Sequence, residues 1–377
     1  MSTWYREGIG LHVSLMNIQK RDAYADRLQR KMLLERRPVS GQIDLTYRCN
    51  LRCVHCFIPK ERDKEELTFD DVISIINKIH KAGCLWLSLS GGEVFLREDS
   101  LDIYTYARKK GFLITILTNG TLINEKIAEY LANLPPHCID ITLNGITERV
   151  YEDVTQVEGS FAKVMKAIKL LAERNIPLTL KANGMKSNGH EIVMIKQFAE
   201  RVLGKKRFRC DLALCAGIDG SKEPCKQRLT PDEIVYIQNS DEDMLACCRE
   251  QFSRHNVDAP LREGYLFPCG LSSFHVDPYG KMRLCLFVKE PCADVESDDF
   301  LQSFARLQGY FLGLTTKAAT RCRHCDIQYL CRQCPGRALA ENGDMEQPIE
   351  FFCELAHRQE ETKGELFSSH DSNARLS

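Results

Sequence analysis

Between residues 42 and 240, apolar runs of strand length alternate with segments that have helical apolar spacing. Such alternation is typical of βαβ units, which place their strands in one parallel sheet. Six runs are strand candidates: 42–47, 85–90, 112–118, 139–144, 177–183 and 207–214. Six units are fewer than the eight of a closed barrel, so the pattern predicts an α/β fold with a partial, TIM-like (β/α)6 barrel.

Helix start signals support this reading of the chain. Thr68 and Asp71 predict a capping-box-like start for a helix that Gly83 ends, with an apolar face formed by Val72, Ile75, Ile76 and Ile79. Ser160 is expected to cap a second helix, and Thr230 with the proline after it predicts the start of a third.

A cysteine motif follows the first predicted strand. Cys49, Cys53 and Cys56 have CxxxCxxC spacing. Three thiolates can bind three irons of a [4Fe-4S] cube and leave the fourth iron free to bind a small molecule. Zinc usually takes four ligands with two-residue gaps, and a redox CxxC needs two thiols, so the spacing alone leaves these alternatives open.

Three further segments follow predicted strands: Gly91-Gly92-Glu93, Asn119-Gly120 and Asn144-Gly145. Paired glycines are what a backbone needs where a cofactor approaches it closely. Because functional residues of a β/α barrel lie at the C-terminal ends of its strands, these segments are expected to share one site with the cysteine motif. Asn-Gly pairs are also common turn formers, and that alternative stays open for either pair.

Composition limits the class of protein. The net charge of −1 argues against nucleic acid as a partner, because binding phosphates needs a basic excess. Eighteen cysteines without a signal peptide indicate a reducing compartment and metal binding. No run approaches the roughly 20 apolar residues that span a bilayer. We therefore expect a cytoplasmic protein with no membrane partner.

The cysteine and Gly-Gly-Glu motifs together resemble those of radical S-adenosylmethionine (SAM) enzymes, over residues 40 to about 357. The resemblance implies that Cys49, Cys53 and Cys56 hold a [4Fe-4S] cluster that binds SAM and cleaves it to a 5′-deoxyadenosyl radical. It also implies a set of residues that contact SAM, with the first beside the adenine: Phe57, Gly91, Gly92, Glu93, Thr142, Asn144 and Leu214.

Several of these assignments have alternatives. Phe57 and Leu214 are also compatible with ordinary core packing. Relatives carry an arginine that binds the SAM carboxylate where this chain has residues 155–158, Thr-Gln-Val-Glu, so Lys181 or another cation must replace it. The identity of a general base is unknown from the sequence.

A second block of seven cysteines resembles the SPASM domain, a loop-rich module with auxiliary clusters: Cys269, Cys285, Cys322, Cys325, Cys331, Cys334 and Cys353. The resemblance implies two auxiliary [4Fe-4S] clusters. Cys322, Cys325, Cys331 and Cys353 would hold one of them. Cys269, Cys285 and Cys334 would hold the other, which lacks one thiol.

The missing ligand has several candidates. Cys247, Cys248 or Cys292 could supply it, or the cluster is open or takes a nitrogen or oxygen ligand. Taken alone, the paired CxxC elements also match a zinc ribbon.

The expected organisation has four parts. Residues 1–39 form a helical extension, residues 40–240 the partial barrel, residues 241–357 the SPASM domain and residues 358–377 a disordered tail.

The resemblance implies an enzyme that abstracts hydrogen from a peptide or protein and installs a thioether or carbon-carbon crosslink. It implies a low-potential electron donor such as flavodoxin or ferredoxin. Because 39 residues precede the barrel, leader recognition would need a separate protein. A sulfatase-maturating enzyme is an alternative, although Leu286 stands where those relatives have an Asp base. A haem- or cofactor-biosynthetic enzyme and a non-catalytic iron-sulfur electron carrier are the others.

Overall fold

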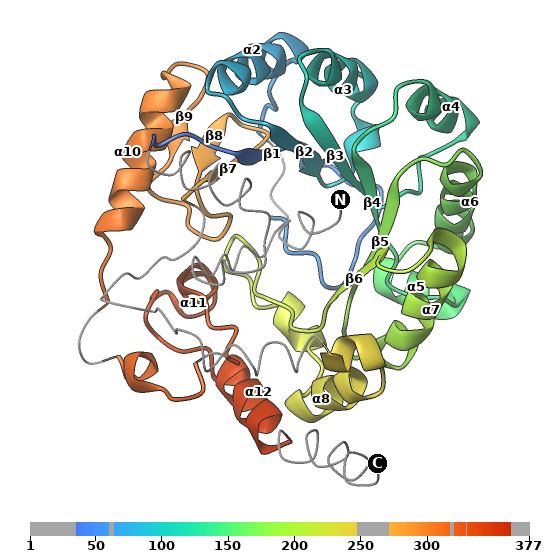
Figure 1. Ribbon diagram of the computed structural model, residues 1–377, viewed down its shortest axis with the longest axis vertical. Helices are drawn as coiled ribbons and strands as arrows, with labels where there is room; N and C mark the ends of the chain where they lie inside the picture. Colours follow the sequence, from blue (N-terminus) through green and yellow to red (C-terminus); the bar gives the residue numbers. More distant parts are fainter. Residues whose placement is uncertain (1–34, 60–63, 247–270, 317–319, 329, 363–377) are drawn as a thin grey trace, which may run out of the picture.

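The computed structural model describes residues 35–59, 64–246, 271–316, 320–328 and 330–362 (Figure 1). The helical pattern expected before residue 35, the cysteines at 247, 248 and 269, and the tail from residue 363 lie outside these ranges. Within the described residues, no helix combines the length and the apolar character that crossing a bilayer requires.

Six parallel strands pair in chain order, as the sequence predicts. They are β1 (Ser40–Thr46), β2 (Trp86–Gly91), β3 (Leu113–Thr118), β4 (Cys138–Thr142), β5 (Leu178–Asn183) and β6 (Phe208–Asp211). The sixth strand ends earlier than expected, because residues 212–214 leave the sheet and begin a loop.

Helices line the outside of the curved sheet (Figure 1). The helices between the strands and after β6 are α2 (Phe69–Lys81), α3 (Ser100–Lys109), α4 (Glu125–Asn133), α5 (Glu148–Thr155), α6 (Ser160–Glu173), α7 (Ile192–Leu203) and α8 (Pro231–Asn239). Successive strand residues point to opposite faces, so Ile43 and Leu45 of β1 enter the apolar core while Asp44 faces the other way. The predicted apolar face of α2 is buried in that core.

Two of the three predicted helix starts are confirmed. Thr68 and Thr230 both form capping boxes, and Pro231 begins α8. The prediction for Ser160 was wrong. Gly159 is the capping residue of α6, and the Ser160 hydroxyl is buried against Thr155 at 2.8 Å, where it cannot reach the free backbone amides.

Three further strands extend the same sheet beyond β1: β7 (Ser273–Val276), β8 (Lys281–Arg283) and β9 (Ala293–Asp294). The strand order is β6-β5-β4-β3-β2-β1-β7-β8-β9, with β7 parallel to β1 and the last two strands antiparallel. An open barrel leaves the backbone of β1 unpaired on one side, and β7 satisfies it. The sheet therefore crosses the expected boundary at residue 240.

The C-terminal part ends in helices α10 (Phe300–Gly313), α11 (Pro335–Asn342) and α12 (Glu350–Glu361). The expected start of a disordered tail at residue 358 was too early. Helix α12 continues past that point because Gln359 is buried and donates a hydrogen bond to Gln238 of α8 at 3.0 Å.

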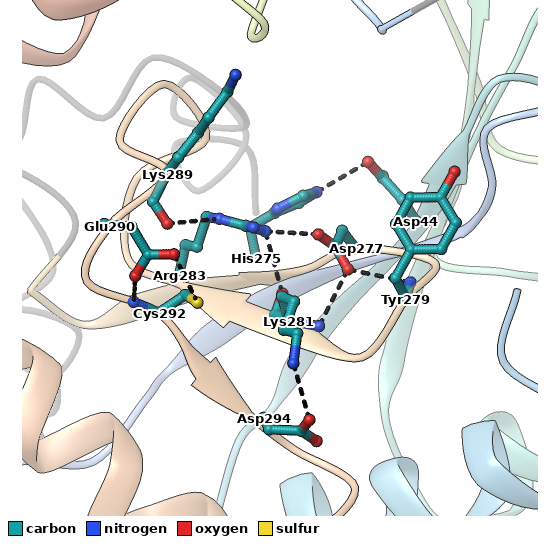
Figure 2. Close-up of polar contacts among 10 residues, drawn as sticks. All are labelled: Asp44, His275, Asp277, Tyr279, Lys281, Arg283, Lys289, Glu290, Cys292 and Asp294. Atoms are coloured by element: carbon teal, nitrogen blue, oxygen red, sulfur yellow. Dashed lines mark hydrogen bonds and ion pairs between the residues drawn. The ribbon is translucent and has the colours of Figure 1, made fainter. Parts of the chain in front are cut away.

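A buried polar network fastens the β7–β8 hairpin to the barrel, as Figure 2 shows. The His275 Nε2 atom lies 2.8 Å from Asp44 Oδ2, which joins β7 to β1 through side chains as well as backbone. Asp277, in the turn between the strands, pairs with Arg283 at 2.6 Å. His275 Nδ1 is buried without a hydrogen-bond partner, so Asp44 is the one polar contact recorded for this ring among the described residues.

We expect Asp44→Ala to lower the free energy of unfolding by about 1–3 kcal/mol, because both ring nitrogens of His275 would then be buried without a partner. Lys281→Ala is the control, since its ion pair with Asp294 is 39–41% exposed and such pairs contribute at most about 1 kcal/mol. Urea unfolding of anaerobic protein measures both. Equal losses in the two variants would contradict the structural role of the buried pair.

Candidate iron-sulfur and cofactor site

The loops after β1, β2 and β3 are hydrogen-bonded to one another. The Gly92 amide donates to Thr46 O at 2.7 Å, and the Glu93 amide donates to Arg48 O at 2.9 Å. The Asn119 amide then donates to the Glu93 carboxylate at 2.8 Å. The cysteine motif, the Gly-Gly-Glu segment and the Asn-Gly segment therefore lie together at the C-terminal ends of the strands.

Gly91 and Gly92 are needed where these loops cross. A Cβ atom on Gly91 would lie 2.1 Å from Thr46 O, and Gly91 has a φ of +134°. A Cβ atom on Gly92 would lie 2.3 Å from Arg48 O. The sequence predicted close approach by a cofactor, but the structure places the protein's own backbone there. These glycines therefore set how the cysteine loop leaves β1.

The three motif thiols differ in their environment. Burial raises the pKa of Cys53 to about 12, and the neighbouring Cys56 and Cys49 thiolates add to this effect. Burial also raises the pKa of Cys49, although the Leu51 amide hydrogen-bonds its sulfur at 3.4 Å. Cys56 is exposed. Buried thiols that repel one another as thiolates need a cation to deprotonate them, and iron ions supply that charge.

The arrangement fits a cluster better than a single metal ion. Among the described residues, no three His, Cys, Asp or Glu side chains are close enough to hold one ion. The thiolates of a [4Fe-4S] cube each bind a different iron, so they need not converge on one point. Cys49, Cys53 and Cys56 would hold such a cube, whose fourth iron has no ligand from this motif.

Glu93 is fully buried, and both of its carboxylate oxygens accept hydrogen bonds. Oε1 accepts from Thr118 Oγ1 at 2.7 Å and from the Phe95 amide at 3.1 Å, and Oε2 accepts from Asn119. Burial nevertheless raises the pKa of Glu93. The carboxylate thus orders the loop after β3, and a contact with the SAM amino group stays a prediction for it.

Asn144 and Asn119 do more than form turns. The Asn144 side chain contacts His55 Nε2 at 3.2 Å and accepts from the Asn183 amide at 2.8 Å. Asn119 Nδ2 lies 3.8 Å from the Cys49 sulfur and 2.9 Å from Asn50 Oδ1. Both asparagines therefore position the cysteine motif.

His55 was missed in the sequence, although a histidine between two cluster cysteines is a visible signal. Burial lowers the pKa of His55 to about 4, so its ring is neutral at physiological pH. A neutral ring can accept from Asn144 Nδ2 through Nε2, which links the cysteine motif to the end of β4.

The other predicted SAM contacts occupy different surroundings. Phe57 is 40% exposed, so the core-packing alternative is wrong for its ring. Leu214 is buried with Val154 and Met185, and Val54 of the cysteine motif packs against this cluster. Thr142 is half-buried at the end of β4. These positions border the cysteine loop, and their contacts with SAM stay predictions.

Lys181, the cation offered for the SAM carboxylate, is already paired. Its Nζ lies 2.6 Å from Asp140 Oδ2, and this carboxylate is 2% exposed. Arg209 lies 3.9 Å from the same carboxylate. Binding of a second carboxylate by Lys181 would therefore weaken an ion pair inside the sheet.

Four of the C-terminal cysteines form one group. Cys322, Cys325 and Cys353 line a cavity of about 450 Å³. Burial raises the pKa of Cys331 to about 12, and the thiolates of the other three add to the shift. This is the ligand set that the SPASM resemblance implies for the complete auxiliary cluster.

Cys285 and Cys334 form a second group. Cys334 is the residue that precedes α11, and a Cβ atom on Gly336 would lie 2.7 Å from the Cys285 sulfur. Cys292, a candidate for the missing ligand, has its thiol 3.4 Å from Glu290 Oε1 instead.

A parallel (β/α)6 sheet with a CxxxCxxC loop after its first strand and a Gly-Gly-Glu segment after its second defines the class of radical SAM domains. Residues 43–199 match the family model described as the radical SAM superfamily. The chain belongs to this superfamily of enzymes.

Two curated relatives and one solved structure illustrate the similarity. The antilisterial bacteriocin subtilosin biosynthesis protein AlbA of Bacillus subtilis is 31% identical over 67% of this chain and 56% of its own length, so the chain spans about half of that relative. The AdoMet-dependent heme synthase of Methanosarcina barkeri is 22% identical over 80% of this chain and 92% of its own length. Streptococcus suis SuiB bound to precursor peptide SuiA has the same fold, with a TM-score of 0.69 and 17% identity over 89% of this chain and 82% of SuiB.

We expect Gly92→Ala to displace the loop after β1, because its Cβ would overlap Arg48 O. The variant should lose about 1–3 kcal/mol of stability and several-fold of the EPR signal that SAM perturbs in the reduced, iron-loaded protein. Gly313→Ala is the control, since no heavy atom lies within 4 Å of a Cβ at that position. A Gly92 variant with control-like stability and EPR signal would disprove the role assigned to this crossing.

Proposed function

We propose that this protein is a radical SAM enzyme that oxidatively modifies a peptide or protein. The observation that carries the proposal is the second group of thiols. Cys322, Cys325 and Cys353 line one cavity, with Cys331 beside them, apart from the cysteine loop after β1. A radical SAM domain needs no second cluster to cleave SAM, so an additional cluster indicates an electron-transfer step on the substrate.

The SAM-bound cluster would supply a 5′-deoxyadenosyl radical, which is the chemistry of the cofactor and not of the side chains. The residues of the chain would orient and shield it. Asn119 and Asn144 hold the cysteine loop in place, and Leu214 with Val54 forms an apolar surface beside it.

Crosslink formation removes two hydrogen atoms from the substrate. One leaves as the hydrogen abstracted by the radical, and the other leaves as a proton and an electron. A cluster bound by Cys322, Cys325, Cys331 and Cys353 would accept that electron. We propose a thioether or carbon-carbon bond as the product.

The names of similar proteins support a peptide substrate. AlbA is a bacteriocin biosynthesis protein, and SuiB has been solved with a precursor peptide. We further propose a flavodoxin or ferredoxin as electron donor, a separate leader-recognition protein and a cytoplasmic location. Every cysteine in the described part of the chain is a free thiol, which agrees with a reducing compartment.

A small-molecule substrate is the second candidate. It is favoured by the heme synthase of Methanosarcina barkeri, which the alignment covers over 92% of its length. Incubation of the iron-loaded, reduced protein with SAM and either a peptide encoded beside its gene or an iron porphyrin distinguishes the two by mass spectrometry.

We expect Cys53→Ala to abolish 5′-deoxyadenosine formation, because it removes a ligand of the SAM-binding cluster. We expect Cys331→Ala to keep SAM cleavage but to stop product formation, because it removes a ligand of the electron acceptor. Chromatography of 5′-deoxyadenosine and mass spectrometry of the substrate measure the two activities.

The matched control is Cys84→Ala, whose buried thiol bonds to backbone carbonyls inside the barrel, at 3.3 Å from Trp86 O. Full product formation by the Cys331 variant would refute the auxiliary electron acceptor. Absence of 5′-deoxyadenosine from the wild-type protein would instead favour a non-catalytic electron carrier.

A further inference from the structure

The loop after β6 packs against the start of α11. Asp211, the last residue of β6, lies 3.1 Å from Arg332 and 3.8 Å from Arg337. Arg337 belongs to the first turn of α11, directly after the cysteine that precedes this helix. The end of β6 is therefore attached to the segment that carries Cys334.

A second attachment lies on the other side of the same loop. Arg228 donates to Leu214 O at 2.9 Å and forms a two-pronged ion pair with Glu341 of α11, at 2.9 and 2.6 Å. Cys215 follows Leu214 directly, so it lies between two contacts that fix the loop on α11. Its position relative to Cys334 is thereby set by the fold.

Arg337 reports which thiols surround this point. Burial would lower the pKa of Arg337, but the Cys215 thiolate, the Asp211 carboxylate and the Cys334 and Cys285 thiolates raise it. Cys334 likewise raises the pKa of Cys215. Because the Cys285 sulfur also lies against Gly336, three thiols gather around the first turn of α11.

We propose that Cys215 is the missing protein ligand of the auxiliary cluster that Cys285 and Cys334 bind. The geometry favours it over Cys292, whose thiol is directed to Glu290. With Cys269, which the SPASM resemblance assigns to this cluster, Cys215 completes four thiolates. The cluster is then closed, and no substrate group coordinates its iron.

The charge of the site fits this assignment. A [4Fe-4S] cube with four thiolates is an anion, and an anion is stabilised at a helix N-terminus and beside a guanidinium. Both are present, since Cys334 precedes α11 and Arg337 lies among the three sulfurs. A Cys215 that only filled space would need no such cation nearby.

The proposal rests on the proposed function, because it presumes auxiliary clusters. The test uses the full chain with Cys49, Cys53 and Cys56 replaced by Ala, so that only auxiliary clusters are loaded. After anaerobic reconstitution, iron per chain and the Mössbauer and EPR spectra are measured for this parent and for Cys215→Ala and Cys215→Ser in it.

We expect the parent to bind about eight irons, as two cubes. Cys215→Ala should lose up to about four irons or convert one cube to a [3Fe-4S] centre with its own EPR signal. Cys215→Ser, which keeps the size of the side chain, should change the spectrum of the same cube. Far-UV circular dichroism establishes that each variant is folded.

Cys225→Ala and Cys225→Ser are the matched controls. Cys225 lies in the same loop and its thiol contacts Glu341 of α11 at 3.8 Å, but no thiol is among the groups that shift its pKa. Cys215 variants that match these controls in iron content and spectra would overturn the assignment of Cys215 alone. A parent chain without cubane signals would overturn the proposed function.

Discussion

The position of the cysteine loop depends on one backbone contact, the crossing of the segments after β1 and β2. The Gly92 amide and the Thr46 carbonyl are 2.7 Å apart, which excludes any side chain at the crossing. Hydrogen bonds then spread from this point, through Glu93 to Asn119 and from Asn119 to the Cys49 sulfur. A cluster bound by this loop would be rigidly held, because each of its neighbouring loops is tied to the same crossing.

The polar face of the sheet follows from the same alternation that gives the core. Isoleucine and leucine residues at alternate positions of the strands are buried under the helices, so the positions between them face the inside of the open barrel. Asp44 with His275 and Asp140 with Lys181 occupy this inner face as hydrogen-bonded or ionic pairs. A parallel sheet covered by apolar layers on both faces would not carry such pairs. The polar residues therefore mark the inner face as the side where a polar cofactor and substrate would be bound.

Local signals were enough to predict the barrel and the placement of its cysteine loop. The six strands and the helix starts at Thr68 and Thr230 depend on residues within a few positions of one another. The pairing of β7 with β1 could not be predicted in this way, because Asp44 and His275 are separated by 231 residues and neither position has a motif of its own. Ser160 failed for the same reason, since its partner Thr155 belongs to the preceding helix.

The loop between β6 and α8 connects the two parts of the candidate site. The Ile218 amide donates to Phe57 O at 2.9 Å, just after the SAM-cluster cysteines, while Arg228 binds Glu341 beside the C-terminal cysteines. Both contacts lie within one short stretch of chain, and β7 joins the C-terminal part to β1 on the opposite side. Two redox centres held by these segments would keep a fixed separation, because changing it would break the sheet or this loop. Electron transfer from a substrate radical depends steeply on distance, so a single sheet that carries both sets of ligands serves the proposed chemistry better than two domains joined by a linker.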